Sequence, residues 1–298
     1  NKIRILPDSV SNKIAAGEVV ERPASVIKEL LENSLDAGAS EIKITIENAG
    51  LRLISVLDNG LGMSYDDALL SIEPHATSKI TSAEDLSRII TFGFRGEALP
   101  SMVSVSRFRM RTKTEGASEG VEIFVEGGSV SRCEPIGCAK GTEISIRDLF
   151  FNVPARKKFL RSEWTEENHI TETVYSLALA NPSVSFELIF DARRIFNSPG
   201  SGSLVSRIRS FFGKSCCENL LPVEFNEGGI NISGFAAKHG NTRSSRKEQR
   251  IFINGRPANS PVIYSGIKNG YGSIVPHGRF PPVILFIKTD PARVDVNV

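Results

Sequence analysis

Glu29 and Asn33 are a carboxylate and an amide whose types and spacing could support hydrolysis. They lie four positions apart in a segment predicted to be helical, so both side chains project from one face of that helix. A carboxylate can accept a proton from an attacking water, and an amide oxygen is a hard ligand suited to Mg²⁺. Taken alone, such a pair is more often part of a solvated helix face, so its chemistry depends on the motifs that follow.

A second candidate is the turn Leu57-Asp-Asn-Gly-Leu-Gly62, which directly follows a predicted strand. The carboxylate of Asp58 at the strand end can accept a hydrogen bond from an exocyclic amine. Glycines such as Gly62 let the backbone approach a ligand closely. Thr142, near the start of another predicted strand, could support Asp58 through its hydroxyl. In isolation the segment is typical of a plain Asp-Asn-Gly turn, and Thr142 of an ordinary strand residue.

Two polar segments further along the chain could hold phosphate. Thr91-Phe-Gly-Phe-Arg-Gly-Glu-Ala-Leu99 leads into a helix predicted to begin near Gly96, and backbone N–H groups at such a start bind phosphate. His75-Ala-Thr-Ser-Lys79 adds hydroxyls and a cation. The polar stretch from about 73 to 96 could therefore close over a ligand as a lid, although each half alone is typical of a solvated loop. The sequence contains neither a Walker A motif nor a dinucleotide-binding fingerprint.

These motifs lie on a predicted mixture of helices and strands. Pro23 can open a helix with apolar residues at helical spacing, which Asp36-Ala-Gly38 ends. Glu41 to Glu47 alternates strictly between polar and apolar residues, which predicts a strand with one buried face. Further helices are predicted at 9–16 and 163–180, and further strands at 51–57, 105–111, 121–126, 142–147 and 184–190. This order predicts an α+β sandwich, a helix layer on a mostly antiparallel sheet, over residues 1–200.

A second, smaller α/β domain is predicted over residues 201–298, after the small polar linker candidate 197–203. Its predicted helices are 204–212 and 260–268, and its predicted strands are 230–237, 249–254 and 282–288. From residue 201 onward the chain has 13 lysines and arginines against 6 aspartates and glutamates, a net charge of +7, whereas the first 200 residues carry −5. The asymmetry suggests that the second domain meets a polyanion, with ordinary solvated charge as the alternative.

Composition excludes several classes of protein. Of the 298 residues, 40% are hydrophobic and 23% are charged, which is typical of a soluble globular protein. No run approaches the roughly 18 apolar residues of a membrane helix, and the N-terminus lacks a signal-peptide core, so we expect a protein that is not secreted. The four cysteines have neither C-x-x-C nor zinc spacing and are expected to be reduced structural thiols.

In this order the motifs resemble the GHKL ATPase superfamily, and longer segments narrow the resemblance to the MutL family of DNA mismatch-repair proteins, above all its bacterial form. The resemblance covers essentially the whole chain. It rests on Ile14-Ala-Ala-Gly-Glu-Val-Val-Glu-Arg-Pro23, Glu32-Asn-Ser-Leu-Asp-Ala-Gly38, His75-Ala-Thr-Ser-Lys-Ile80, Gly93-Phe-Arg-Gly-Glu-Ala-Leu99, Asp148-Leu-Phe-Phe-Asn-Val-Pro-Ala-Arg156 and Val294-Asp-Val-Asn-Val298. It implies a GHKL ATP-binding domain over 1–200 and a transducer-like, DNA-binding domain over 201–298.

The resemblance implies Mg²⁺-dependent ATP hydrolysis, with roles that fall on matching positions. Glu29 would be the general base that activates water, and Asn33 would ligate the Mg²⁺ that bridges the phosphates. Asp58 would bind the adenine amino group with help from Thr142, and Gly62 would let the backbone approach the base. Phosphoryl transfer depends on positioning and charge neutralisation, which suits so small a set of residues. The other implied nucleotide contacts are Thr77, Ser78 and Lys79 of the lid and Gly93, Phe94, Arg95, Gly96, Glu97, Ala98 and Leu99 around the β- and γ-phosphates.

The resemblance also implies a nucleotide-driven clamp that binds DNA. Arg256 is the leading expected contact, with sequence-independent binding to phosphate. Few aromatic residues interleave with the basic ones, so base stacking is not expected. ATP would order the lid and the apolar arm Ile3–Pro7 and two copies would associate, although an arm that packs on its own sheet is the alternative. The other expected DNA contacts are Arg243, Arg246, Lys247 and Arg250.

The implied setting is the bacterial cytoplasm, on the nucleoid, with a mismatch-recognition protein and a downstream repair nuclease or helicase as partners. Two other functions stay open. A non-catalytic scaffold would hold nucleotide only as a structural ligand, and Glu29 argues against it because binding alone needs no base. A topoisomerase ATPase subunit would share the pocket but predicts different residues in place of 148–156.

The chain departs from the family pattern at a few positions. Pro100 stands where the family usually has a small residue, and we expect it in the first turn of its helix, where a missing N–H is tolerated. Glu73-Pro74 replaces a residue that is often basic, which is expected to change lid mobility. The chain starts at Asn1 and stops at Val298, before a family lysine that reaches the γ-phosphate and before a C-terminal dimerisation domain. We therefore expect weak ATP turnover by these residues alone.

Overall fold

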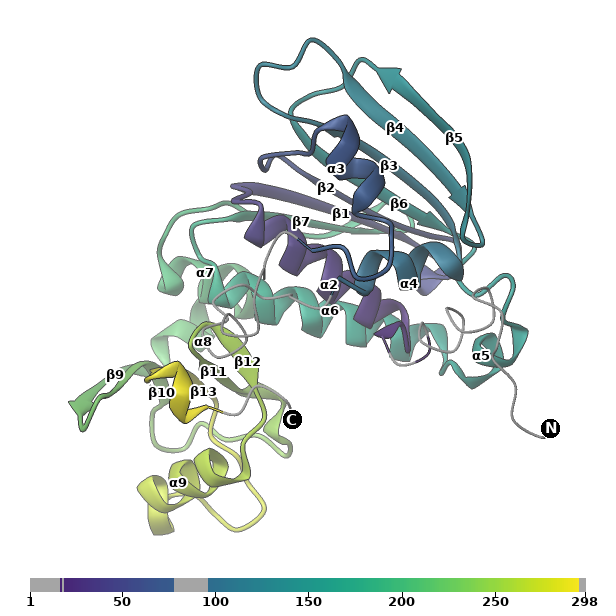
Figure 1. Ribbon diagram of the computed structural model, residues 1–298. Coiled ribbons are helices and arrows are strands. Elements are labelled where there is room, and N and C mark those ends of the chain that lie inside the picture. The colour runs from purple at the N-terminus through teal and green to yellow at the C-terminus, as the bar shows by residue number, and fades with distance from the viewer. Residues whose placement is uncertain (1–16, 18, 78–95, 295–298) are drawn as a thin grey trace, which may run out of the picture. The chain divides into compact units, whose positions relative to one another are not determined.

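The computed structural model describes residues 17, 19–77 and 96–294, which form two compact units (Figure 1). The first unit comprises 17–77, 96–175 and 183–202, and the second comprises 176–182 and 203–294. The predicted helix 9–16, the arm at residues 3–7 and most of the predicted lid lie outside the described residues. Within the described ranges, no helix combines the length and apolar character needed to cross a membrane.

Eight strands of the described chain form one sheet in the first unit, in the order β5-β4-β3-β6-β2-β1-β7-β8. Neighbouring strands are antiparallel except β1 and β7, which are parallel, so the predicted mostly antiparallel sheet is confirmed. The strands are β1 (Glu41–Glu47), β2 (Leu53–Asp58), β3 (Arg107–Lys113), β4 (Gly120–Glu126), β5 (Ser129–Ile136), β6 (Gly141–Arg147), β7 (Ser185–Phe190) and β8 (Arg193–Ser198).

Helices cover one face of this sheet, as predicted. Figure 1 shows α2, α3 and α4 on the same side, and α2 packs against both β2 and α4. Val26, Ile27 and Leu30 of α2 are buried because apolar residues at this spacing share one helix face. The helices are α2 (Pro23–Asp36), η1 (Asn48–Gly50), α3 (Tyr65–Leu70), α4 (Ala98–Ser104), α5 (Pro154–Phe159) and α6 (Glu163–Ala180).

The helix expected near Gly96 is α4, which begins at Ala98. Pro100 is its third residue, so the expectation that this proline lies in the first turn is confirmed. A proline there removes an N–H that has no partner inside the helix, which explains why it is tolerated.

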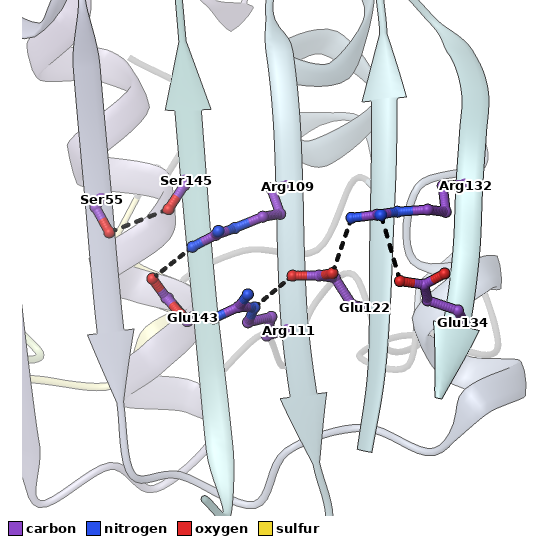
Figure 2. A network of polar contacts seen from close by, with 8 residues as sticks. All are labelled: Ser55, Arg109, Arg111, Glu122, Arg132, Glu134, Glu143 and Ser145. Carbon is purple, nitrogen blue, oxygen red and sulfur yellow. Dashed lines mark hydrogen bonds and ion pairs between the residues drawn. The ribbon is translucent and has the colours of Figure 1, made fainter. Parts of the chain in front are cut away.

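The other face of the sheet carries a ladder of charged side chains (Figure 2). Glu122 on β4 is buried and accepts hydrogen bonds from Arg111 on β3, at 2.5 Å, and from Arg132 on β5, at 3.2 Å. The ladder continues through Arg109 to Glu143 on β6, at 3.1 Å. Since strand residues alternate between faces, the buried Phe108, Met110 and Ile123 point to the helices and these charges point away from them.

The second unit is built on five described strands in the order β12-β11-β13-β10-β9. Its core joins Ile208 and Phe252 to Leu179 and Ile284. Its elements are α7 (Leu204–Phe212), α8 (Lys214–Glu218), β9 (Leu220–Glu227), β10 (Ile230–Ala237), η3 (Arg246–Glu248), β11 (Gln249–Ile253), β12 (Arg256–Ala258), α9 (Pro261–Tyr271), η4 (Gly272–Ile274), β13 (Val283–Lys288) and η5 (Pro291–Arg293).

The predicted linker 197–203 is too long at both ends. Asn197 and Ser198 belong to β8, and the Ser203 side chain caps α7 by accepting a hydrogen bond from the Ser206 N–H. Small polar residues are typical of linkers and of helix caps alike, so composition alone could not separate the two roles.

Candidate functional site

Asp58 is the last residue of β2 and is buried, with 7% of its surface exposed. Its Oδ2 accepts a hydrogen bond from the Ser34 hydroxyl at 2.7 Å, and its Oδ1 accepts one from the Gly60 N–H at 2.9 Å. Ser34 lies on α2 and is itself buried. The end of β2 and the last turn of α2 are therefore joined at this carboxylate.

The electrostatics of Asp58 are set by burial among neutral donors. Burial raises the pKa of its carboxyl, while hydrogen bonds from the Ser34 hydroxyl and from the backbone of Gly60 and Thr142 lower it, and burial prevails. Across the described residues, the structure gives this carboxylate no cationic partner. An ionised carboxylate held in this way is a strong acceptor for a ligand amine.

Thr142 contacts Asp58 by a different route from the predicted one. Its backbone, not its hydroxyl, bonds the carboxylate, while the hydroxyl lies 3.0 Å from that of Thr112 on β3. The Thr112 hydroxyl donates to the Gly141 carbonyl at 3.1 Å and accepts from the Met63 N–H at 2.9 Å. Thr112 therefore fixes the turn after β2 against the neighbouring strands.

Gly62 and Gly141 are required by this close packing. Gly62 has φ +68°, and a Cβ there would lie 2.0 Å from the Lys113 carbonyl oxygen. Gly141 has φ +116°, and its Cβ would lie 2.0 Å from the Asp58 carbonyl oxygen. Gly62 was predicted to let the backbone approach a base, and the structure gives it a second reason, which is contact with the end of β3.

Glu29 and Asn33 lie on α2 and are both partly buried. Asn33 directly precedes Ser34, so the contact between Ser34 and Asp58 fixes the position of this part of α2. The neighbouring carboxylate, Glu32, is buried and lies 3.7 Å from the Lys28 ammonium, which gives it a structural partner. Glu32 thus has a structural role, and Glu29 stays the predicted catalytic carboxylate of this helix.

The predicted phosphate-binding residues fall into two groups. Thr77 and the residues Gly96, Glu97, Ala98 and Leu99 are described and partly buried. The predicted contacts Ser78, Lys79, Gly93, Phe94 and Arg95 lie outside the described residues.

No cluster of three or more histidine, cysteine, aspartate or glutamate side chains suited to a metal occurs in the part of the chain that the structure describes. Mg²⁺ bound to a nucleotide keeps several waters and takes phosphate oxygens, so it needs few protein ligands. Asn33, whose amide oxygen the sequence predicts as the ligand of such an ion, lies on α2.

The basic residues predicted to bind DNA differ in their burial and in their side-chain partners. Arg250 is buried, donates to the Ser176 hydroxyl at 3.3 Å and lies over the Phe212 ring, so we withdraw it from the DNA contacts. Arg243 is partly buried and pairs with Glu248 at 2.8 Å. The guanidinium of Arg246 lies over the rings of Tyr264 and Phe280. Lys247 is exposed, and Arg256 on β12 is partly buried.

Two residues of the site were missed from the sequence, Ser34 and Thr112. The signal for Ser34 is its position directly after Asn33, but its contact with Asp58 depends on the packing of β2 against α2. Thr112 carries no local signal, because its role depends on strand register, which pairs it with Thr142.

Two protein-family models match the chain. Residues 21–127 match the family described as histidine kinase-, DNA gyrase B-, and HSP90-like ATPase. Residues 208–298 match the family described as DNA mismatch repair protein, C-terminal domain.

Curated relatives match along the full chain. The DNA mismatch repair protein MutL of Opitutus terrae is 48% identical over 297 residues, covering 100% of this chain and 47% of the relative. That of Syntrophotalea carbinolica is 49% identical over 299 residues, covering 100% of this chain and 48% of the relative. The chain thus spans about half the length of the curated relatives it matches.

Solved structures match the architecture. The Aquifex aeolicus MutL ATPase domain complexed with ADP aligns with a TM-score of 0.69 at 31% identity, covering 92% of this chain and 94% of that one. The N-terminal domain of a DNA repair protein aligns with a TM-score of 0.82 at 24% identity, covering 96% of this chain and 89% of that one, which supports the fold alone.

Proposed function

Because the chain belongs to the MutL family of DNA mismatch-repair proteins, we propose that its first unit binds ATP at the end of β2 and hydrolyses it weakly. The observation that carries this proposal is the buried Asp58 carboxylate, whose partners in the described structure are all neutral. A site of this kind selects a ligand that brings its own hydrogen-bond donor. The adenine amino group is such a donor, and the Aquifex aeolicus relative was solved with ADP.

Glu29 acts as the general base in this proposal. Its place on α2, one turn before Asn33, puts it on the helix face next to the residue proposed to hold the metal. The carboxylate accepts a proton from the attacking water and orients that water toward the γ-phosphate. Asn33 would hold Mg²⁺ through its amide oxygen, and the ion would supply positive charge that neutralises the phosphates.

The remaining nucleotide contacts are proposed from the family motifs. Thr77, Ser78 and Lys79 contribute hydroxyls and a cation to the phosphates, and backbone groups from Gly93 to Leu99 surround the β- and γ-phosphates. Gly62 and Thr142 complete the adenine end.

Replacement of Glu29 with alanine tests the hydrolytic part. We expect ATP to bind with unchanged affinity and turnover to fall about 10²- to 10⁴-fold, the usual contribution of a general base. Single-turnover hydrolysis and calorimetric titration with Mg·ATP measure the two quantities. Glu21→Ala is the matched control, since Glu21 is exposed and precedes α2. Turnover at the uncatalysed background in both wild type and Glu29→Ala would favour the non-catalytic scaffold, and equal turnover above background would exclude Glu29 as the base.

We also propose that the second unit binds DNA phosphates without sequence preference. Arg256, Arg246, Lys247 and, more weakly because of its pairing with Glu248, Arg243 are the proposed contacts. The net charge of +7 from residue 201 onward supports this assignment.

Replacement of Arg256 with glutamate is expected to weaken DNA binding at low salt. It should also make the salt dependence shallower by about one released ion for each phosphate that the variant no longer neutralises. Lys268→Glu changes the charge equally at an exposed position of α9 and is the control. Fluorescence anisotropy over a salt series measures both. Equal losses of affinity in the two variants would mean that only overall charge matters.

The wider role is a proposal drawn from the family. ATP binding drives association of two copies, and the nucleotide state couples a mismatch-recognition protein to downstream repair enzymes in the bacterial cytoplasm. Each of these steps involves the whole protein, and this chain spans about half the length of the curated relatives it matches.

A further inference from the structure

His75 and Glu97 form a contact that the proposed function does not use. The His75 Nδ1 lies 2.5 Å from the Glu97 Oε1, so an Nδ1–H donates to the carboxylate. The two residues lie on opposite sides of the segment 78–95 in the sequence. The chain that leaves α3 and the chain that enters α4 are therefore tied together at this point.

A second observation lies at the same point. Gly96 has φ +65°, and a Cβ there would lie 2.6 Å from the Ala76 carbonyl oxygen and 3.1 Å from the Ala76 nitrogen. The backbones of 76 and 96 thus cross in direct contact, next to the side-chain pair. No side chain larger than hydrogen fits at 96 without moving one of the two segments.

A third observation is the backbone of His75 itself, which has φ +63°. A non-glycine residue in the left-handed region is strained, so a contact must hold it there. The Glu97 side chain is 27% exposed and that of His75 is 85% exposed. The carboxylate is therefore mostly covered, and the histidine contacts it from the solvent side.

We propose that His75 and Glu97, with the crossing of Ala76 and Gly96, form a clasp that positions the chain at Gly96–Leu99. His75 acts as a positioning residue for nucleotide binding, because it holds Glu97 and thereby the residues that follow it. This inference rests on the proposed function, which places Thr77 and Gly96–Leu99 beside the phosphates.

Variants of His75 test the clasp. His75→Gly removes the donor and relieves the backbone strain, so a loss of function in it does not come from a strained fold. His75→Asn keeps a donor at the position of Nδ1 in a residue that tolerates positive φ. His75→Gln places the donor one bond further out, where Nε2 stood.

We expect His75→Gly and His75→Gln to raise the Kd for Mg·ATP about three- to fivefold, the scale of one largely exposed pair. His75→Asn is expected to restore wild-type affinity. Glu97→Ala removes the same hydrogen bond as His75→Gly. The double variant His75→Gly/Glu97→Ala is therefore expected to bind Mg·ATP no more weakly than the weaker-binding of these two single variants. Calorimetric titration measures all of these, and Glu119→Ala, at an exposed position between β3 and β4, is the control for loss of a surface carboxylate.

Three results would overturn the clasp: unchanged affinity in His75→Gly, a fall in affinity in His75→Asn as large as in His75→Gln, or additive effects in the double variant. Failure of the proposed function has a different signature, because wild-type protein itself would then bind no Mg·ATP in the same titration.

Discussion

Asp58 and Glu122 are two buried carboxylates of one sheet, with 7% and 3% of their surfaces exposed, and they are held in opposite ways. Asp58 points to the helix-covered face and is bonded by a hydroxyl and by backbone N–H groups. Glu122 points to the other face and lies between the guanidinium groups of Arg111 and Arg132 (Figure 2).

The difference shows how to separate a binding carboxylate from a structural one. The charge of Glu122 is neutralised within the fold, so it contributes to stability and offers little to a ligand. The charge of Asp58 is not neutralised by a cation, and burial raises the pKa of its carboxyl because it disfavours the charged form. A buried acid whose partners among the described residues are all neutral is therefore the better candidate for a ligand-binding site.

The largest effect expected to test this comparison comes from exchanging these two acids for their amides. Asp58→Asn should weaken Mg·ATP binding about 10- to 100-fold, since a hydrogen bond to a charged group is removed. At pH 7 it should leave the melting temperature unchanged or raise it, because the amide carries no penalised charge. Glu122→Gln should lower the free energy of unfolding by about 1 kcal/mol, discounted because its arginines are a third to a half exposed, and leave binding unchanged.

Calorimetric titration and thermal denaturation of both variants measure this crossed pattern. The distinction between the two acids fails if Asp58→Asn destabilises the fold as Glu122→Gln does while ATP binding survives.

A smaller effect, dependent on pH, is expected from Ser34→Ala. The Ser34 hydroxyl lowers the pKa of Asp58, so its removal raises that pKa further above the ordinary value. Binding needs the ionised acid, so ATP affinity should begin to fall at a higher pH than in wild type, with a loss of about two- to tenfold at the acidic end. Titrations between pH 5 and 8 measure the shift.

The same substitution affects stability with a defined sign. Because the folded-state pKa of Asp58 lies above the unfolded value, its stabilising contribution is complete below the unfolded pKa and is lost as pH rises through the folded pKa. In Ser34→Ala that decline extends to higher pH. Ser55→Ala, on the other face beside Ser145, is the matched control, and a parallel pH shift in it would refute the role of Ser34.

Periodicity predicted the elements that have one apolar face. The alternation of 41–47 predicted β1 with the same bounds, and helical spacing after Pro23 predicted α2. β5 was not predicted from the sequence, because an edge strand with mostly exposed residues has no alternation of buried and exposed positions. β12 escaped because it is three residues long.

The motifs of the site were predicted one by one from the sequence, but the contacts between them were not. Asp58 stood out as an acid at a strand end, but its partner Ser34 depends on how β2 meets α2. Arg250 looked like its basic neighbours in the sequence, and only the fold shows that it is buried. Register and packing couple residues far apart in the chain, so local pattern does not contain them.

The parallel pairing of β1 with β7 has a consequence for folding during synthesis. Ile44 pairs with Val56 on one side and with Leu188 on the other. At a synthesis rate of about 5–20 residues per second, β1 waits roughly 7 to 30 s on the ribosome before its second neighbour emerges. Throughout that interval the nascent chain exposes a strand edge with unpaired N–H and C=O groups, the kind of surface that chaperones shield from aggregation.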